Sequence, residues 1–192
     1  MTDETMAETV ESEPVPSAED GGPVRFMPQL ISLDYTVRTN PMAGAFGAAL
    51  ADGRITGHRC PKCHLVYVPP KGFCPICTIE TTAADEVAVA DQGIVTSWTV
   101  LTPIQYHGQT ERSDYALASV LLGGADGTIG QQRLLEVPLD QIRLGLQVEA
   151  VWAPPDQREP DDRGYGLGTA IEGWRPTGEP DAPAAEYEKH TL

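Results

Sequence analysis

The chain has 192 residues, of which 28 are acidic and 13 are basic, so its formal net charge is −15. This length allows one domain or two small ones. The negative charge argues against a protein that binds nucleic-acid phosphates, because that affinity comes mainly from Lys and Arg. The charge is uneven, however: seven acids and no base lie within residues 1–24, whereas residues 25–152 carry a net charge of only −3. The total therefore excludes less than it first indicates.

Residues 1–24 contain proline and almost no large apolar side chains. Such a segment buries too little surface to offset its ordering entropy, so we expect a disordered acidic tail. It has neither the basic start nor the apolar stretch of a secretory signal, and no window approaches the roughly 18 apolar residues of a membrane span. We therefore expect a cytoplasmic protein without a membrane span, in which four cysteines indicate a metal or a redox pair rather than disulfides.

Residues 25–53 are predicted to be a helical N-terminal segment. Asn40 followed by Pro41 is typical of a helix start, because Asn caps free N–H groups and Pro lacks one where none is needed. Gly53 is typical of a helix end. The apolar residues that share one face of this predicted helix are Met42, Phe46, Ala49 and Leu50.

Residues 54–79 are predicted to be a small metal-binding module. Two C-x2-C pairs lie ten residues apart, and each pair can present two thiolates to one shared ion. Four thiolates complete a tetrahedral zinc shell and leave no vacant position for a catalytic water, so the site is predicted to be structural. The predicted ligands are Cys60, Cys63, Cys74 and Cys77.

The cysteine pattern has three other interpretations: iron in place of zinc, a redox pair, and a site with histidine ligands. Iron in a four-cysteine site has the same geometry, and the spacing does not distinguish the two metals. A thioredoxin-like redox motif needs a single C-x2-C in a βαβ context, which does not fit. His58 and His64 lie near the cysteines in sequence, but four thiolates already complete the shell, so both are interpreted as surface histidines.

The cysteine module is basic within an acidic chain. Residues 53–79 contain Arg54, Arg59, Lys62 and Lys71 and no acid. One interpretation is that these bases offset the net charge of about −2 of a zinc ion with four thiolates. The other is a surface that binds anions such as phosphates, and the two interpretations are compatible.

Residues 80–176 are predicted to be a small β-barrel, and residues 177–192 a polar tail. Short segments with period-two alternation are separated by Gly, Pro and Asp clusters, which is typical of a barrel or sandwich. A short helical turn is predicted at 138–143 and a hairpin turn at 123–130. The predicted strands are 93–101, 115–122, 132–137, 146–152 and 168–174.

No catalytic residue is predicted. The glycine-rich segment 123–130 follows a strand but opens no helix and lacks the lysine of a P-loop. The loop at 103–114 is long for a hairpin, and excess loop length is more often functional than idle. We therefore predict that Tyr106 and His107 in this loop contact a partner or a substrate.

Together these residues resemble the DUF35 family. The likeness covers about residues 41–176, with its most specific features in the two C-P-x-C pairs, in Pro69 and Pro70, and in the segments G-I-V-T at 93 and G-L-Q-V at 145. The resemblance implies a mainly β protein with an N-terminal helix, a rubredoxin-like zinc ribbon and a five-stranded OB-fold barrel. Family members often have Gly after the second cysteine of each pair, where His64 and Thr78 stand here.

The resemblance also implies a function in acyl-CoA metabolism. Family members look like accessory subunits of thiolase-fold proteins, among them lipid-transfer-protein-like aldolases that shorten steroid side chains. The resemblance implies a non-catalytic but required subunit of a heteromer, expected to be a heterotetramer. Its partner would bind the acyl-CoA and hold the catalytic residues. The four bases of the cysteine module would then contact the CoA phosphates.

A second functional hypothesis is a module that binds single-stranded nucleic acid, because zinc ribbons and OB-folds both occur in such proteins. OB-fold binders stack bases on aromatic side chains in a positively charged groove. Bases are sparse around the aromatic residues of the predicted barrel, so the sequence favours the accessory subunit. A self-sufficient small enzyme ranks last, because no nucleophile–base pair is evident.

Overall fold

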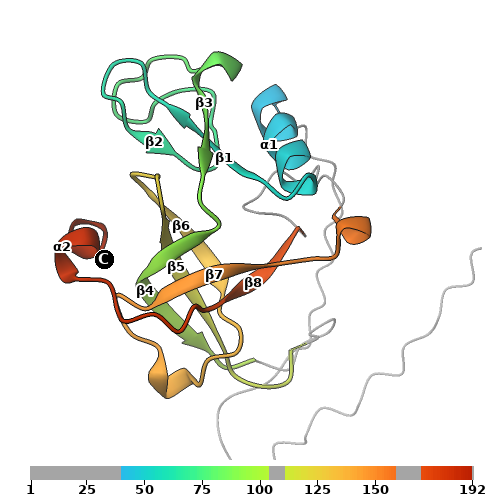
Figure 1. Ribbon diagram of the computed structural model, residues 1–192, viewed down its shortest axis with the longest axis vertical. Helices are drawn as coiled ribbons and strands as arrows, with labels where there is room; N and C mark the ends of the chain where they lie inside the picture. Colours follow the sequence, from blue (N-terminus) through green and yellow to red (C-terminus); the bar gives the residue numbers. More distant parts are fainter. Residues whose placement is uncertain (1–39, 104–110, 159–169, 192) are drawn as a thin grey trace, which may run out of the picture. The chain divides into compact units, whose positions relative to one another are not determined.

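The computed structural model describes residues 40–103, 111–158 and 170–191 (Figure 1). These residues form one helix of 11 residues, a three-stranded antiparallel sheet and a five-stranded sheet, with several short helical turns between them. Within them, no helix has the length and apolar character needed to cross a membrane.

Helix α1 (Pro41–Ala51) begins and ends where the sequence predicts. The Asn40 side chain accepts a 2.8 Å hydrogen bond from the Ala43 N–H group. The helix ends before Gly53, which has a φ of +75° and donates its N–H group to the Leu50 carbonyl. The helix lies beside strand β1 (Figure 1). Its buried face differs from the predicted one by one residue: it consists of Phe46, Gly47, Ala49 and Leu50, with Met42 half-buried.

The smaller sheet has the order β2-β1-β3 and belongs to the cysteine module. Its strands are β1 (Ile55–Arg59), β2 (Val66–Tyr67) and β3 (Glu86–Val89). β3 pairs with β1 over four residues, from Ile55 opposite Val89 to His58 opposite Glu86. The sheet therefore extends into residues that the sequence analysis assigned to the barrel.

The larger sheet is a closed barrel with the strand order β6-β5-β4-β7-β8. All neighbouring pairs are antiparallel, and a parallel bridge between Leu134 and Trp174 joins the two outer strands. This is the five-stranded Greek-key barrel of the OB-fold, which confirms the predicted fold class. Its strands are β4 (Gln92–Leu101), β5 (Tyr115–Leu122), β6 (Thr128–Arg133), β7 (Gln147–Trp152) and β8 (Ile171–Pro176).

Trp174 lies at the closure of the barrel. Its side chain is fully buried, and its indole N–H group donates to the Gln132 side-chain oxygen at 3.1 Å. Its backbone carbonyl accepts a 2.8 Å hydrogen bond from the Leu135 N–H group. Next to it, Gly173 leaves room for the opposite backbone: a Cβ atom there would lie 2.8 Å from the Arg133 carbonyl oxygen. The barrel closure therefore combines a large buried side chain, Trp174, with a neighbouring glycine, Gly173, that lets two backbones approach closely.

One hydrophobic cluster runs through the helix, the cysteine module and the barrel. Val66 of β2 belongs to this cluster and also makes a polar contact with the barrel. Its N–H group donates to Asp126 Oδ2 and its carbonyl accepts from the Asp126 N–H group, both at 2.9 Å. Asp126 lies in the turn between β5 and β6. Its carboxylate and its backbone N–H group together bind both backbone groups of Val66, as a neighbouring strand would.

The third barrel strand lies earlier than the sequence predicts. It was expected at 132–137, with a hairpin turn at 123–130, but β6 already begins at Thr128. The alternation is hidden because the ladder with β5 shifts register between Ala118 and Val120, and Gln131 has a φ of +57°. Gly130 and Gln131 are exposed, so this part of the strand has no apolar face to recognise.

The predicted polar tail contains a folded segment, residues 181–190, which we call the C-terminal hook. It contains helix α2 (Ala184–Tyr187) followed by a 3₁₀ turn, Glu188–His190, neither of which the sequence analysis predicted. Arg143 binds Asp181 through two hydrogen bonds of 2.6 and 2.7 Å, and the Ala182 N–H group donates to the Gly145 carbonyl. Polar composition alone gave no sign of these contacts, because they depend on the fold.

Gly173→Ala is expected to lower the free energy of unfolding by about 1–3 kcal/mol, because the added methyl group overlaps the Arg133 carbonyl and the Leu135 side chain. Urea denaturation checks this result. Gly130→Ala is the matched control: the nearest atom to its Cβ position is 3.9 Å away, so a change within about 0.5 kcal/mol is expected. Equal effects of the two substitutions would contradict the proposed close approach at the barrel closure.

Candidate metal centre

Four cysteines from two loops meet at the end of the smaller sheet. The sulfur atoms of Cys60, Cys63, Cys74 and Cys77 all lie within 4.8 Å of one another. Cys60 and Cys74 are fully buried, whereas Cys63 and Cys77 are half-buried. The arrangement offers four soft donors to one ion and fits a structural metal, because no position in the shell stays free for water.

The backbone of each C-x2-C turn also points at sulfur. The N–H groups of Lys62 and Cys63 lie 3.4 and 3.5 Å from Cys60 Sγ, and the Cys77 N–H group lies 3.3 Å from Cys74 Sγ. These contacts favour the thiolate, which is the form that binds metal. The first cysteine of each pair is therefore the more buried one, and its sulfur accepts from the backbone of its own turn.

The pKa values of the thiols in this cluster are shifted in opposite directions. Burial alone would raise the pKa of Cys74, but backbone N–H groups and the neighbouring thiols together lower it to about 6. Burial, together with the surrounding thiols, raises the pKa of Cys77 to about 12. Without an ion the cluster therefore retains protons at neutral pH, and a metal that binds all four sulfurs must displace them.

Each cysteine turn ends in a left-handed residue. His64 has a φ of +62° and Thr78 a φ of +55°. Their N–H groups donate 2.9 Å hydrogen bonds to the carbonyls of Cys60 and Cys74, which closes the two turns in the same way. These are the positions where the DUF35 resemblance leads one to expect Gly. Residues with a side chain, above all the β-branched Thr78, are strained there.

The two histidines near the cluster differ in environment. His64 is exposed, as predicted. The interpretation of His58 as a surface residue is wrong: its side chain is buried, and its Nδ1 atom lies 3.0 Å from the Thr81 hydroxyl oxygen. It is buried because β1 lies in the middle of the smaller sheet. Its place on a strand was the missing information.

Tyr67 is a residue of this site that the sequence analysis did not single out. Burial, together with the negative charge of Cys74, raises the pKa of its phenol to about 12. Its ring also lies 3.8 Å from the Cβ position of Gly127 in the turn that follows Asp126. Tyr67 therefore lies between the cysteine cluster and the barrel.

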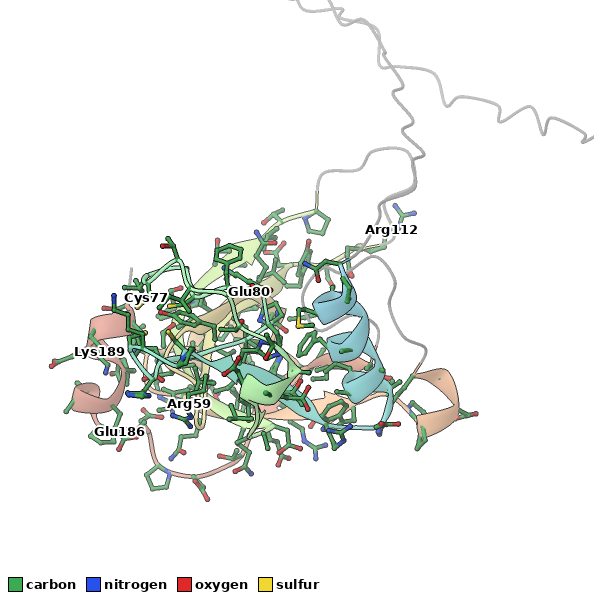
Figure 2. The ribbon with its side chains drawn as sticks, turned by 90° about the horizontal axis from the view of Figure 1, so that it is seen from above. Arg59, Cys77, Glu80, Arg112, Glu186 and Lys189 are labelled. Carbon is green, nitrogen blue, oxygen red and sulfur yellow. The ribbon has the colours of Figure 1, made fainter. Side chains whose placement is uncertain are left out.

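The four bases of the cysteine module have different surroundings. Arg59, labelled in Figure 2, donates a 3.1 Å hydrogen bond to the His64 carbonyl, so it supports the first cysteine turn. Arg54 forms an exposed 3.3 Å ion pair with Asp52. Lys62 and Lys71 are exposed. The module has no acid in its own sequence, but acids from outside it lie close to two of the four bases. Asp52 pairs with Arg54, and Asp85 and Glu86 line a small pocket with Arg59.

Tyr106 and His107, predicted to contact a partner or substrate, lie outside the described residues. The chain that follows them is held firmly: Arg133 makes a bidentate ion pair with Glu111 and stacks over the Tyr115 ring at 5.0 Å from its centre. The hydrogen bonds from Arg133 lower the pKa of the Glu111 carboxyl. The loop therefore joins β5 at a fixed point beside the barrel closure.

Comparison with known proteins finds similarity at two levels, in the sequence of the cysteine module and in the fold. Residues 48–80 match the family model described as ChsH2, rubredoxin-like zinc ribbon domain. The fold is similar to that of a chain of the solved "Ltp2-ChsH2(DUF35) aldolase", with 22% sequence identity, a TM-score of 0.52, and coverage of 73% of this chain and 98% of that chain. No curated protein matches the sequence.

A second solved structure is also similar. It is a DUF35-family protein of unknown function from Sulfolobus solfataricus, with 19% identity, a TM-score of 0.48, and coverage of 59% of this chain and 79% of that chain. The resemblance to DUF35 that the sequence predicts is confirmed by the ribbon match and by the fold of the aldolase chain.

Cys60→Ser is expected to release the bound metal and to unfold the cysteine module, because structural metal binding supplies folding free energy on the order of 10 kcal/mol. Metal content by mass spectrometry and amide hydrogen exchange across residues 54–89 check both effects. His64→Gly is the control: it removes the nearby histidine and is expected to keep a full metal complement. Loss of metal in that variant would place His64 in the shell and contradict the four-cysteine site.

Thr78→Gly is expected to stabilise the metal-bound protein by about 1 kcal/mol, because Gly adopts a φ of +55° without the strain that Thr meets there. Thermal denaturation of the metal-loaded protein measures the change. Thr99→Gly, at an exposed position within β4, is the matched control and is expected to lose stability. A loss of similar size in both variants would show that residue 78 is not strained.

Proposed function

We propose that the chain is a non-catalytic, required subunit of a thiolase-fold or lipid-transfer-protein-like acyl-CoA enzyme. The favoured reaction of that enzyme is the cleavage of a carbon–carbon bond in steroid side-chain degradation, and the assembly is a heterotetramer in the cytoplasm. The observation that carries this proposal is the combination of a ChsH2-type ribbon with an OB-fold barrel in one chain. One solved protein with a similar fold is described as "Ltp2-ChsH2(DUF35) aldolase".

The chemistry of the described residues supports an accessory role. The four thiols are gathered in one cluster that a metal would occupy fully. His58 is buried against Thr81 and has no access to a substrate. In the proposed complex the partner supplies the catalytic residues, and this chain completes the active site and the channel for the CoA thioester.

We propose zinc as the resident metal. The four thiolates form a soft, tetrahedral donor set, and such sites in intracellular proteins most often hold zinc. Iron would fit the same donors, and metal analysis of protein purified without added metal distinguishes the two. Zinc bound here would hold the two cysteine turns together rather than take part in the reaction.

An exposed apolar patch on β4 supports contact with another protein. Trp98 and Val100 are 40% and 43% exposed, and they alternate with Thr99, so both lie on one face of the strand. Exposed large apolar side chains of this kind often mark protein interfaces, and Trp is frequent among residues that dominate binding energy. β4 leads directly into the loop that contains Tyr106 and His107. We propose that this end of the barrel contacts the thiolase-fold partner.

The basic side chains of the cysteine module are proposed to attract the CoA phosphates. Arg54, Lys62 and Lys71 are exposed, and Arg54 also forms an exposed ion pair with Asp52. Arg59 differs, because it already holds the His64 carbonyl. Cations near the entrance of a channel raise the local concentration of an anionic substrate.

The complex is tested by co-expression with a thiolase-fold protein from the same genome. The two proteins are expected to co-purify, and aldol cleavage of a steroid side-chain CoA thioester is expected to need both. Trp98→Ser is expected to weaken the complex at least tenfold, measured by calorimetry, because it removes a large apolar contact. Leu144→Ser, at a similarly exposed apolar residue outside β4 in the segment before β7, is the control. A stable single chain that neither binds the partner nor changes its activity would overturn the proposal.

A further inference from the structure

A pocket of about 260 Å³ lies between the smaller sheet and the barrel. One side is formed by the start of β1 and by β3 with the residues that follow it, and the other by Asp91 and Trp152. Thr56 pairs with Ala88 across the β1–β3 ladder, so Arg54 and Ala90 share the same face of the sheet two residues further along. The pocket therefore has a floor of small side chains with Arg54 at its edge.

Thr56 is the unusual residue of this floor. Its side chain is only 3% exposed, and its hydroxyl oxygen has no hydrogen-bond partner in the part of the chain that the structure describes. Buried polar groups are almost always paired, and one without a partner often marks a site that a water, an ion or a ligand completes. No feature of the sequence singled out this threonine, because its burial depends on the sheet.

Two guanidinium groups lie in or beside the pocket. Arg54 is one: it is among the lining residues and forms an exposed ion pair with Asp52. Arg158 is the other: it stacks on the Trp152 ring, with its central carbon 5.1 Å from the ring centre. It also fills the space beside Gly53, where a Cβ atom would lie 2.5 Å from its Nη1 atom. Arg158 therefore lies against two residues that line the pocket, Trp152 and Gly53.

Two acids also lie near the pocket, and each has a partner. Asp91 accepts a 3.1 Å hydrogen bond from the Trp152 indole, which fixes the wall of the pocket. Asp52 is paired with Arg54, but both side chains are largely exposed, and exposed ion pairs of this kind contribute little. An oxyanion that reaches Arg54 from inside the pocket can therefore replace Asp52 as its partner at small cost.

We propose that this pocket binds a phosphate group through the Arg54 guanidinium and the Thr56 hydroxyl, with Arg158 adding positive charge at the entrance. A guanidinium fork and a hydroxyl donor are the groups that recognise phosphate oxygens. The proposal rests on the CoA part of the proposed function for its physiological ligand and narrows it to one site: of the four bases of the cysteine module, Arg54 is the one that lines this pocket with Thr56.

The test uses the full chain and its Trp152 indole N–H signal in NMR, assigned with Trp152→Phe. Inorganic phosphate and coenzyme A are expected to shift this signal saturably, and acetate to shift it at least tenfold more weakly. Tighter binding of coenzyme A than of inorganic phosphate, by tenfold or more, assigns the site to the cofactor. Equal affinity assigns it to free phosphate, and the phosphate site stands in both cases.

The variants separate this site from general surface charge. Arg54→Gln is expected to weaken phosphate binding at least tenfold, whereas Lys189→Gln, which removes one exposed positive charge outside the pocket, is expected to leave it within twofold. Thr56→Val is expected to weaken binding at least threefold while the protein folds normally, because valine fills the same space without an unpaired hydroxyl, and Thr56→Ser is expected to restore it.

Three results would overturn the proposal: no saturable shift with either phosphate ligand, equal losses in Arg54→Gln and Lys189→Gln, or unchanged binding in Thr56→Val. These measurements need no partner chain. A failure here is therefore distinct from a failure of the proposed complex, which is measured by co-purification and aldol cleavage.

Discussion

The convergence of four thiols on one point is the constraint on which the cysteine module depends. Between Cys60 and Cys77 the chain has only the two-residue strand β2, and large apolar side chains such as Phe73 and Ile76 stay 50% and 70% exposed. So little buried surface cannot fix these loops, since apolar burial is the main favourable contribution to folding. A shared ion that binds both turns supplies the missing constraint, as in other small metal-dependent domains.

The metal centre and the barrel are joined through β2. Val66 follows the first cysteine turn by three residues, and it is both part of the hydrophobic cluster and hydrogen-bonded in both directions to Asp126. Tyr67, next to it, lies between the thiols and Gly127. Because these contacts hold the turn between β5 and β6, the position of the barrel turn depends on whether the cysteine turns are in place. A structural metal can in this way affect a turn of the barrel that holds none of its ligands.

Local signals predicted those parts of the molecule that local chemistry determines. Asn40 and Gly53 specify the ends of α1 through hydrogen bonds within a few residues, and the alternation of Ala116 to Leu122 specifies β5 because one face is buried along its whole length. The spacing of the cysteines specified a cluster that the structure brings together within 4.8 Å. In each case the cause and its effect lie within a short stretch of chain.

Other parts could not be predicted, because their cause is distant in sequence. β6 was displaced since its register depends on a shift in the ladder with β5. The C-terminal hook depends on Arg143 and Gly145, about 40 residues earlier in the chain. His58 and Thr56 are polar residues that become buried only because β3 covers one edge of β1. Polar residues on a central strand are therefore the positions where a sequence prediction of exposure fails first.

Strand β1 connects the two candidate sites. Thr56 lies four residues before Cys60, and the strand between them is held on one edge by β3 and on the other by β2. The backbone of Cys60 continues β1 and pairs with Leu65 at 2.9 Å, so a metal that fixes the first cysteine also fixes the end of the strand. The proposed phosphate pocket at the beginning of β1 uses the same strand as its floor. A metal that fixes the Cys60 end of β1 therefore also restrains the Thr56 end of the strand. There, the Thr56 hydroxyl and the Arg54 guanidinium must keep their spacing to recognise a phosphate.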